Sequence, residues 1–453
     1  MPPIQKTWAG VVLALWAASA GAQDTAPPEP VPPREVEVPP AVERSPVRTG
    51  WRVQGLPLVN YNSDEGLGYG ARLMLVDRGN GTERPYRMVF VAQFFQTTRG
   101  VANHRLFLDA PRFLESRWRL AASVGIINDR FSPYFGLGQR AGYTAAYATC
   151  ADRGTLSTNP DVCPDNPDFR GLRYYTYDQR TLPSIMLNGR RQLGDSPWQL
   201  EVGYRFRLTD VRTRYGADDL GQARESLLEE DIRAGLVGGL GEERAGGLLR
   251  LRSGEVNAGV ILDLRDNEPA PVRGMFHEFA LRGAAPATGS AFTYGGASLN
   301  LRFYHPLFTE RLVAALRLFG DVVAGDVPFT LLSTFTGIEW REGFGGIGGV
   351  YSARGILKNR LQGKAKLLGN GELRWKFLSV EPGGQRLDFT LISFFDAGRA
   401  WTDPRFRDAT TTLYGAGGGL RIAWEENFVV RADYGVSPRD GTTGFYLDFN
   451  HMF

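Results

Sequence analysis

The feature that most constrains the fold of this chain is a two-residue alternation of apolar and polar side chains that recurs along most of its 453 residues. Trp198, Leu200 and Val202 begin one run of apolar residues at every second position, and Glu201 and Arg205 alternate with them. Successive side chains of a β-strand point to opposite faces, so each such run predicts a strand with one apolar and one polar face. The same period recurs in residues 118–126, 256–264, 312–318, 414–424 and 428–434.

The length of these runs indicates which kind of sheet they build. Many extend over about 11–14 residues, whereas strands of soluble proteins average about 5–6 residues and strands that cross a bilayer need about 9–11. A soluble β-sandwich would show the same alternation with its apolar face inside, but with shorter strands. The lengths favour an all-β transmembrane antiparallel β-barrel, whose apolar face meets lipid and whose polar face lines a lumen.

The runs number sixteen, and their order predicts the topology of the barrel. They begin near residues 51, 66, 84, 101, 117, 173, 198, 254, 274, 291, 309, 366, 387, 411, 428 and 443. The three long connections, 131–172, 212–253 and 325–365, all follow odd-numbered strands, and the connections after even-numbered strands are short. Outer-membrane barrels have long outer loops and short periplasmic turns. We therefore expect an outer-membrane protein with both termini in the periplasm.

The first fifty residues differ from the rest. Lys6, an apolar run from Trp8 to Ala18 and the small residues Ala20 and Ala22 predict a signal peptide over residues 1–22. The alternative is a membrane anchor, but the apolar run is shorter than the roughly 20 residues of a spanning helix. Residues 23–50 are rich in proline and predict an extended periplasmic linker. The barrel domain is expected over residues 51–453.

Composition excludes several classes of function. A formal net charge of +3 gives no support for nucleic-acid binding. The chain has only four histidines, and alternation places His277 and His451 on the lipid face. No serine–histidine or metal-ligand spacing is present, so we expect neither an enzyme nor a cofactor.

The two cysteines, Cys150 and Cys163, lie in one polar stretch inside the first long connection. In an oxidising compartment a pair this close predicts a disulfide. Two free thiols are the alternative.

The C-terminal strand carries apolar residues at every second position, with His451 as the exception: Phe445, Leu447, Phe449 and Phe453. A final aromatic residue on an alternating strand is typical of the signal that outer-membrane assembly machinery reads. We therefore expect that machinery and outer-membrane lipid among the partners of the chain.

Residues 343–399 hold the strongest candidate for a functional constellation. Alternation places Glu372 and Asp396 on the lumenal faces of strands twelve and thirteen. Arg354 lies on the long connection that precedes strand twelve, and it could pair with both acids if that loop entered the lumen. The alternative is that Arg354 is a solvated loop residue and that the acids line a wet pore.

These segments resemble the BamA-like superfamily of outer-membrane assembly and two-partner-secretion barrels, and the resemblance covers residues 51–453. Those barrels have sixteen strands and a sixth outer loop whose Val-Arg-Gly-Tyr/Phe motif folds into the lumen. Here the motif reads Ala353-Arg354-Gly355-Ile356, which keeps Arg-Gly and loses the valine and the aromatic residue. The resemblance implies a loop-to-lumen contact made by Arg354, Gly355, Glu372, Phe394, Asp396 and Gly398. A second match is a periplasmic turn with Arg265, Asp266, Asn267, Pro271 and Gly274.

The resemblance implies a pore that inserts or translocates a protein or lipid client, which the sequence does not identify. It also implies a weak seam between the first and last strands, and Pro57 and Gly444 fit that expectation. Family members normally carry POTRA domains before the barrel. Residues 23–50 are too few for one, so the chain resembles a POTRA-less branch. A passive porin-like channel and a surface-exposed structural or adhesive barrel are the alternatives.

Overall fold

A computed structural model describes residues 49–80, 86–143, 149–150, 155–156, 172–217, 223–245, 247–268, 270–335, 344–424, 428–449 and 451–453. The predicted signal peptide, most of the proline-rich linker and Cys163 lie outside these residues. The domain boundaries at residues 22 and 50 and the disulfide therefore stay predictions.

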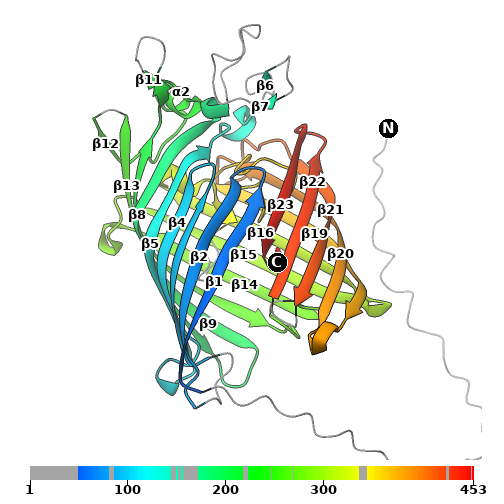
Figure 1. Cartoon of the computed structure of the whole chain (residues 1–453). Helices are drawn as coiled ribbons and strands as arrows, with labels where there is room; N and C mark the ends of the chain where they lie inside the picture. The colour runs from blue at the N-terminus through cyan, green and yellow to red at the C-terminus, as the bar shows by residue number, and fades with distance from the viewer. Residues whose placement is uncertain are drawn as a thin grey trace, which may run out of the picture. The chain divides into compact units, whose positions relative to one another are not determined.

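Sixteen long strands form one antiparallel sheet that closes into a barrel, as expected (Figure 1). They are β1 (Trp51–Asn62), β2 (Gly66–Asp77), β3 (Met88–Thr97), β4 (Val101–Ala110), β5 (Trp118–Pro133), β8 (Thr176–Gln192), β9 (Trp198–Arg212), β13 (Leu248–Asp263), β14 (Gly274–Ala284), β15 (Tyr294–Leu307), β16 (Thr309–Gly325), β19 (Ala365–Val380), β20 (Leu387–Trp401), β21 (Leu413–Trp424), β22 (Phe428–Ser437) and β23 (Thr442–Phe449).

In the described ranges, the elements within the connections are short. These are the helix α2 (Leu227–Arg233) and the small strands β6 (Thr149–Cys150), β7 (Thr155–Leu156), β10 (Tyr215–Ala217), β11 (Ala223–Arg224), β12 (Glu242–Arg244), β17 (Thr334–Phe335) and β18 (Phe344–Gly345). Single turns of 3₁₀-helix lie at Phe113–Glu115, Gly138–Arg140, Leu172–Tyr175, Pro286–Thr288, Phe329–Leu331 and Pro382–Gly384. None of the helices in the described ranges is both long enough and apolar enough to cross a bilayer.

The two faces of the wall divide as the alternation predicts. In β9 the side chains of Trp198, Leu200 and Val202 are exposed on the outer surface, whereas Glu201 and Arg205 are buried inside. An exposed apolar outer face and a buried polar inner face are the reverse of a soluble fold. They are the arrangement that a lipid environment requires.

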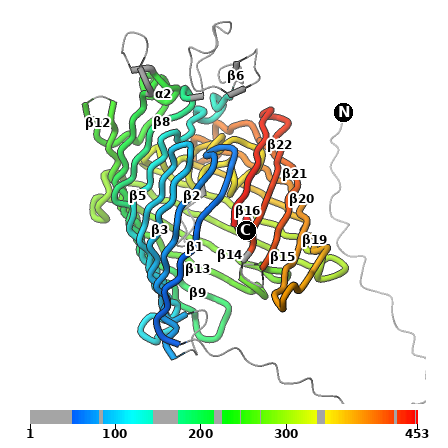
Figure 2. Tube along the Cα trace, in the orientation of Figure 1, coloured from blue at the N-terminus to red at the C-terminus, as the bar shows by residue number. Residues whose placement is uncertain are grey.

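Long and short connections separate to opposite ends of the barrel. The three longest run over 134–175, 213–247 and 326–364 and lie at the end where Figure 2 places α2, β6 and β12. At the opposite end, the connections between neighbouring strands within the described ranges include residues 193–197, 264–273 and 381–386. We refer to these as the long-loop end and the short-turn end.

One predicted strand start is clearly displaced. The eighth strand was expected near residue 254, but β13 begins at Leu248 because it pairs with β9 as far as Arg212. Residues 248–253 thus extend the wall upward at the long-loop end instead of belonging to a loop.

The separation of the two ends predicts the outcome of surface proteolysis. If the long-loop end faces outward, protease added to intact cells should cut within 134–175 or 213–247 and spare the turns at 264–273 and 381–386. Mass spectrometry of the fragments measures this directly. Cleavage confined to the turns would require the barrel to be inserted in the opposite direction.

Candidate functional site

The sixth loop, residues 326–364 between β16 and β19, is described at 326–335 and 344–364, and these residues turn into the barrel and pack against the inner wall. Its apolar side chains Ile347, Ala353, Ile356 and Leu361 form a buried cluster with residues of four barrel strands, namely Phe319, Leu368, Ala400 and Leu413. Ile347 and Leu361 also bond to each other through their backbones, which closes the base of the inserted segment. The loop is therefore held inside by apolar burial as well as by charge.

Arg354 lies at the innermost part of the loop and meets acids from three strands. Its Nε and Nη2 donate to Asp396 of β20 at 2.8 and 3.1 Å, and its Nη1 donates to Glu372 of β19 at 2.7 Å. Nη1 also donates to Asp433 of β22 at 3.3 Å. The guanidinium lies over the ring of Phe394 at 3.6 Å. All five donors of an arginine are planar, and here one fork spans neighbouring carboxylates that a point charge could not bridge.

The burial of Arg354 decides how much this contact matters. The side chain of Arg354 is 0% exposed, as are the side chains of Glu372 and Asp396. Burial alone would lower the pKa of Arg354, but the carboxylates of Asp396 and Glu372 outweigh it and raise that pKa. The guanidinium is therefore charged, and its loss would leave Asp396 as an uncompensated charge inside the barrel.

Sequence reasoning named Glu372 and Asp396 but missed the third acid, Asp433. This residue also accepts hydrogen bonds from Arg421 at 2.6 and 3.1 Å, and Arg431 binds the nearby Asp448 at 3.1 Å. The alternation of 428–434 does place Asp433 on the lumenal face. Nothing in that period indicates that the sixth loop reaches as far as β22.

Glycines make the close approach of the loop possible. Gly355 has φ = +84°, and a Cβ atom built on it would lie 2.6 Å from the backbone nitrogen of Val436. Its own N–H donates to the hydroxyl of Tyr446 at 3.0 Å, and its carbonyl accepts from Thr442 at 2.7 Å. A Cβ on Gly398 would meet the side chain of Ile347 at 2.5 Å. Arg354, Gly355 and Gly398 thus all contribute to the contact between the sixth loop and the inner wall.

The sixth loop also binds both edges of the sheet. Lys358 of the loop donates to Glu65 at 2.6 Å, and its backbone N–H donates to Asp64 at 3.0 Å, both in the turn after β1. Arg360 donates to Asp440, in the turn before β23, at 3.0 Å. One loop therefore bridges the first and last strands from inside.

Lys358 also donates to Asp129 of β5 at 2.8 Å. Burial and charge act differently on the two acids of the turn after β1 that hold Lys358. Burial raises the pKa of Asp64 to about 6. Burial would also raise the pKa of Glu65, but the Lys358 ammonium outweighs it and lowers that pKa. Both carboxylates are therefore mainly charged at neutral pH.

The turn over 264–273 contains four residues of the second motif, namely Arg265, Asp266, Asn267 and Pro271, and the fifth, Gly274, begins β14. Arg265 donates to Asp263 at 2.8 and 2.9 Å, and Asp266 accepts the N–H groups of residues 272 and 273. Gly274 has φ = +108°, where a Cβ would lie 2.0 Å from a backbone oxygen. The residues of this motif therefore set the backbone conformation of the turn.

The C-terminal residues depart from the predicted alternation. The ladder between β22 and β23 ends at Phe449, and Phe453 lies in the lumen with Tyr304, Val313 and Ala315. Its ring lies between the guanidinium groups of Arg317 and Arg374, at 5.0 and 5.3 Å. The prediction that Phe453 continues the outward face is therefore wrong, because its ring contacts these cations and an apolar part of the inner wall.

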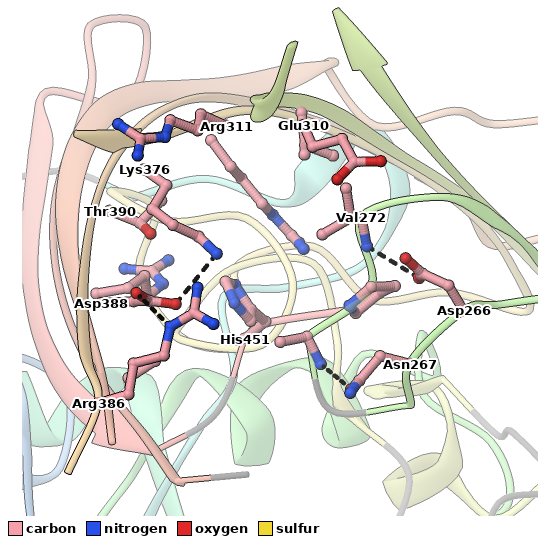
Figure 3. A pocket seen from close by; sticks show the side chains of 16 residues that line it. Asp266, Asn267, Val272, Glu310, Arg311, Lys376, Arg386, Asp388, Thr390 and His451 are labelled. Carbon is pink, nitrogen blue, oxygen red and sulfur yellow. Dashed lines mark hydrogen bonds and ion pairs between the residues drawn. The ribbon is translucent and has the colours of Figure 1, made fainter. Parts of the chain in front are cut away.

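His451 was also expected on the lipid face, and this expectation is wrong for the same reason. Its side chain lines a lumenal cavity at the short-turn end (Figure 3). Phe445 does lie on the outer surface, as predicted. In the part of the chain that the structure describes, no group of three His, Cys, Asp or Glu residues could hold a metal ion.

Comparison with known proteins decides the family. The model of the Omp85 superfamily domain matches residues 111–453, which is more than half of the chain. The chain belongs to the Omp85 superfamily. Among solved structures, it is similar to BamA from Haemophilus ducreyi lacking POTRA domains 1–3, with a TM-score of 0.52 and 13% identity over 89% of this chain and 70% of that one. It is equally similar to CdiB from Escherichia coli, with a TM-score of 0.52 and 12% identity over 88% of this chain and 63% of CdiB. A comparison with curated proteins found no significant match.

The expected resemblance to BamA-like barrels is therefore confirmed, and at these identities the structural likeness shows the fold alone. As an Omp85 barrel the protein is a multi-pass β-barrel of the outer membrane. Barrels of the Omp85 superfamily are non-enzymatic transport or assembly proteins, which agrees with the expectation that the chain is not an enzyme.

Proposed function

We propose that this Omp85 barrel is a pore that inserts proteins into the outer membrane or translocates them across it. The observation that carries the proposal is the short pairing between the first and last strands. Only two registered positions join β1 to β23, Tyr61 with Leu447 and Asn62 with Tyr446, whereas twelve positions join β1 to β2. In Figure 1 the blue and dark red strands run apart toward the short-turn end.

Unpaired backbone groups at a strand edge can bind another strand, and closed barrels normally remove such edges. Among the described residues, β1 forms no registered pair with β23 over residues 51–60. Pro57 lies within this stretch and has no N–H to contribute to a ladder. An edge of this kind supports lateral exchange of a polypeptide more than it supports a rigid solute channel.

The passive channel is the weaker alternative. The sixth loop lies in the lumen and is held to the inner wall through Arg354, an arrangement that opposes a large resting conductance. Gly444, expected to weaken the seam, has another role as well: a Cβ there would lie 2.1 Å from the Tyr446 hydroxyl that binds the loop.

A disulfide across the seam tests the proposal. In cells depleted of the native protein, a Tyr61→Cys/Leu447→Cys variant should restore the outer-membrane protein composition only when a reductant keeps the seam open. The matched control is Val59→Cys/Tyr69→Cys, which joins the same face of β1 to β2 and should work in both redox states. Both composition and secreted protein are measured by quantitative proteomics.

The outcome separates the candidates. If depletion changes neither outer-membrane proteins nor secreted proteins, or if the locked seam works normally, the insertion and translocation proposal fails. A large, stable single-channel conductance of the refolded protein would then favour the porin-like reading.

A further inference from the structure

A cavity of about 250 Å³ opens at the short-turn end of the lumen, next to the inward-turned C-terminal residues (Figure 3). A single water needs only about 10–15 Å³ on this measure. The walls come from β16, β19, β20, β21, the turn 264–273, Arg386 before β20 and His451 after β23.

Positive charge exceeds negative charge in this lining. The five cations are Arg311, Arg374, Lys376, Arg386 and Arg421, and the three acids are Asp266, Glu310 and Asp388. The acids are already engaged: Asp388 binds two of the cations, as the dashed lines in Figure 3 show, and Asp266 accepts backbone N–H groups. The guanidinium of Arg311 makes no ion pair among the residues that the structure describes.

Two buried guanidinium groups in the lining have N–H groups that no described residue accepts. Arg374 donates from Nε to Glu372 and from Nη2 to the carbonyl of Phe453, but its Nη1 has no acceptor. Arg421 uses both terminal nitrogens on Asp433, and its Nε has none. These side chains are only 4% and 1% exposed. Buried donors of this kind call for a bound acceptor.

We propose that the cavity binds a phosphate group, on the surplus donors of Arg374, Arg421 and Arg311. A tetrahedral anion offers more acceptor positions than the two oxygens of a carboxylate, which matches donors that converge from β16, β19 and β21. The volume leaves room for a substituent on the phosphate, and Val272, Val313 and Ala423 supply an apolar side for it. The site does not depend on the proposed function.

Titration of the refolded full chain in micelles tests the proposal, with inorganic phosphate and glycerol 3-phosphate as probes at constant ionic strength. Isothermal calorimetry should show saturable binding of at least one probe, with a dissociation constant of about 1 mM or tighter. Tighter binding of the ester would identify a headgroup-like ligand, and equal or weaker binding would identify free phosphate.

Two variants and one control test whether the phosphate binds in this cavity. Arg311→Gln should weaken binding roughly three- to fivefold, the range of an exposed ion pair. Asp388→Asn should tighten it by about threefold, since it frees Lys376 and Arg386 from their shared acid. The matched control is Arg117→Gln, a turn residue at the same end that pairs with Asp195 outside the cavity, and it should bind as the parent does.

Each variant is also compared on gels before and after boiling. A change of migration on boiling shows that the unboiled protein was a closed barrel. Failure of both probes to bind saturably would overturn the proposal and leave water as the acceptor. Equal binding by Arg311→Gln, Asp388→Asn and the parent would place any phosphate elsewhere on the protein.

Discussion

Arg354→Ala should destabilise the barrel by about 3–5 kcal/mol, because it leaves the buried carboxylate of Asp396 without its cation and removes one of the cations that bind Glu372. The guanidinium is fully buried and donates to carboxylates on three strands. Water therefore does not solvate the carboxylates when the guanidinium is removed. Urea unfolding of the refolded protein measures the change in free energy. Single-channel recording should also show a larger conductance as the loop leaves the lumen.

Related substitutions separate a buried contact from a solvated one. Arg354→Lys should recover only part of the loss, since an ammonium cannot bridge two carboxylates as a planar fork does. Asp396→Asn should resemble Arg354→Ala, and the double change should cost less than the sum of both. Arg405→Ala, in an exposed loop, is the control and should change stability by no more than about 0.5 kcal/mol. An Arg354→Ala protein that behaves like this control would contradict the loop-to-lumen role.

Gly355→Ala should destabilise the loop contact by about 2–4 kcal/mol through two additive causes. The positive φ of +84° disfavours any residue with a Cβ, and that Cβ would lie 2.6 Å from the backbone of Val436. Backbone cannot move aside as a flexible side chain can. The measured effects are a lower urea midpoint and faster proteolysis within the sixth loop.

Gly441→Ala is the matched control for Gly355→Ala. Gly441 has φ = +67° with nothing within 4 Å of the built Cβ, so it carries the backbone strain without the collision and should cost about 1 kcal/mol. Equal effects of the two substitutions would mean that the loop does not press against β22.

The alternation of side chains predicts the strands well because a strand has a period of two and a barrel wall has two chemically different faces. Sixteen runs became sixteen strands, and Glu372, Phe394 and Asp396 lie inside as their positions predict. The pairing of Arg354 with these acids came from the resemblance. Periodicity assigns a residue to a face, but it does not indicate which loop will come to meet it.

The errors have the same origin. Asp433 was on a correctly predicted face, yet its contact with Arg354 depends on how far the loop reaches. Phe453 and His451 were assigned by extending the alternation of β23, and the pattern held only while β22 supplied a partner strand. Beyond Phe449, the ring of Phe453 contacts cations on β16 and β19. These residues are distant in the sequence, so the alternation near the C-terminus does not predict the contact.

The bridging of both edges by Lys358 and Arg360 makes the seam and the sixth loop thermodynamically linked. If the seam opens as proposed, β1 and β23 move apart, and we expect this to weaken the contact of the loop with one of the two turns that hold these cations. By reciprocity, a ligand that favours the parted edges must loosen the loop by the same coupling free energy, and a variant with a loosened loop must part more readily. If the seam opens as proposed, we therefore expect the lumen and the lateral edge to change together.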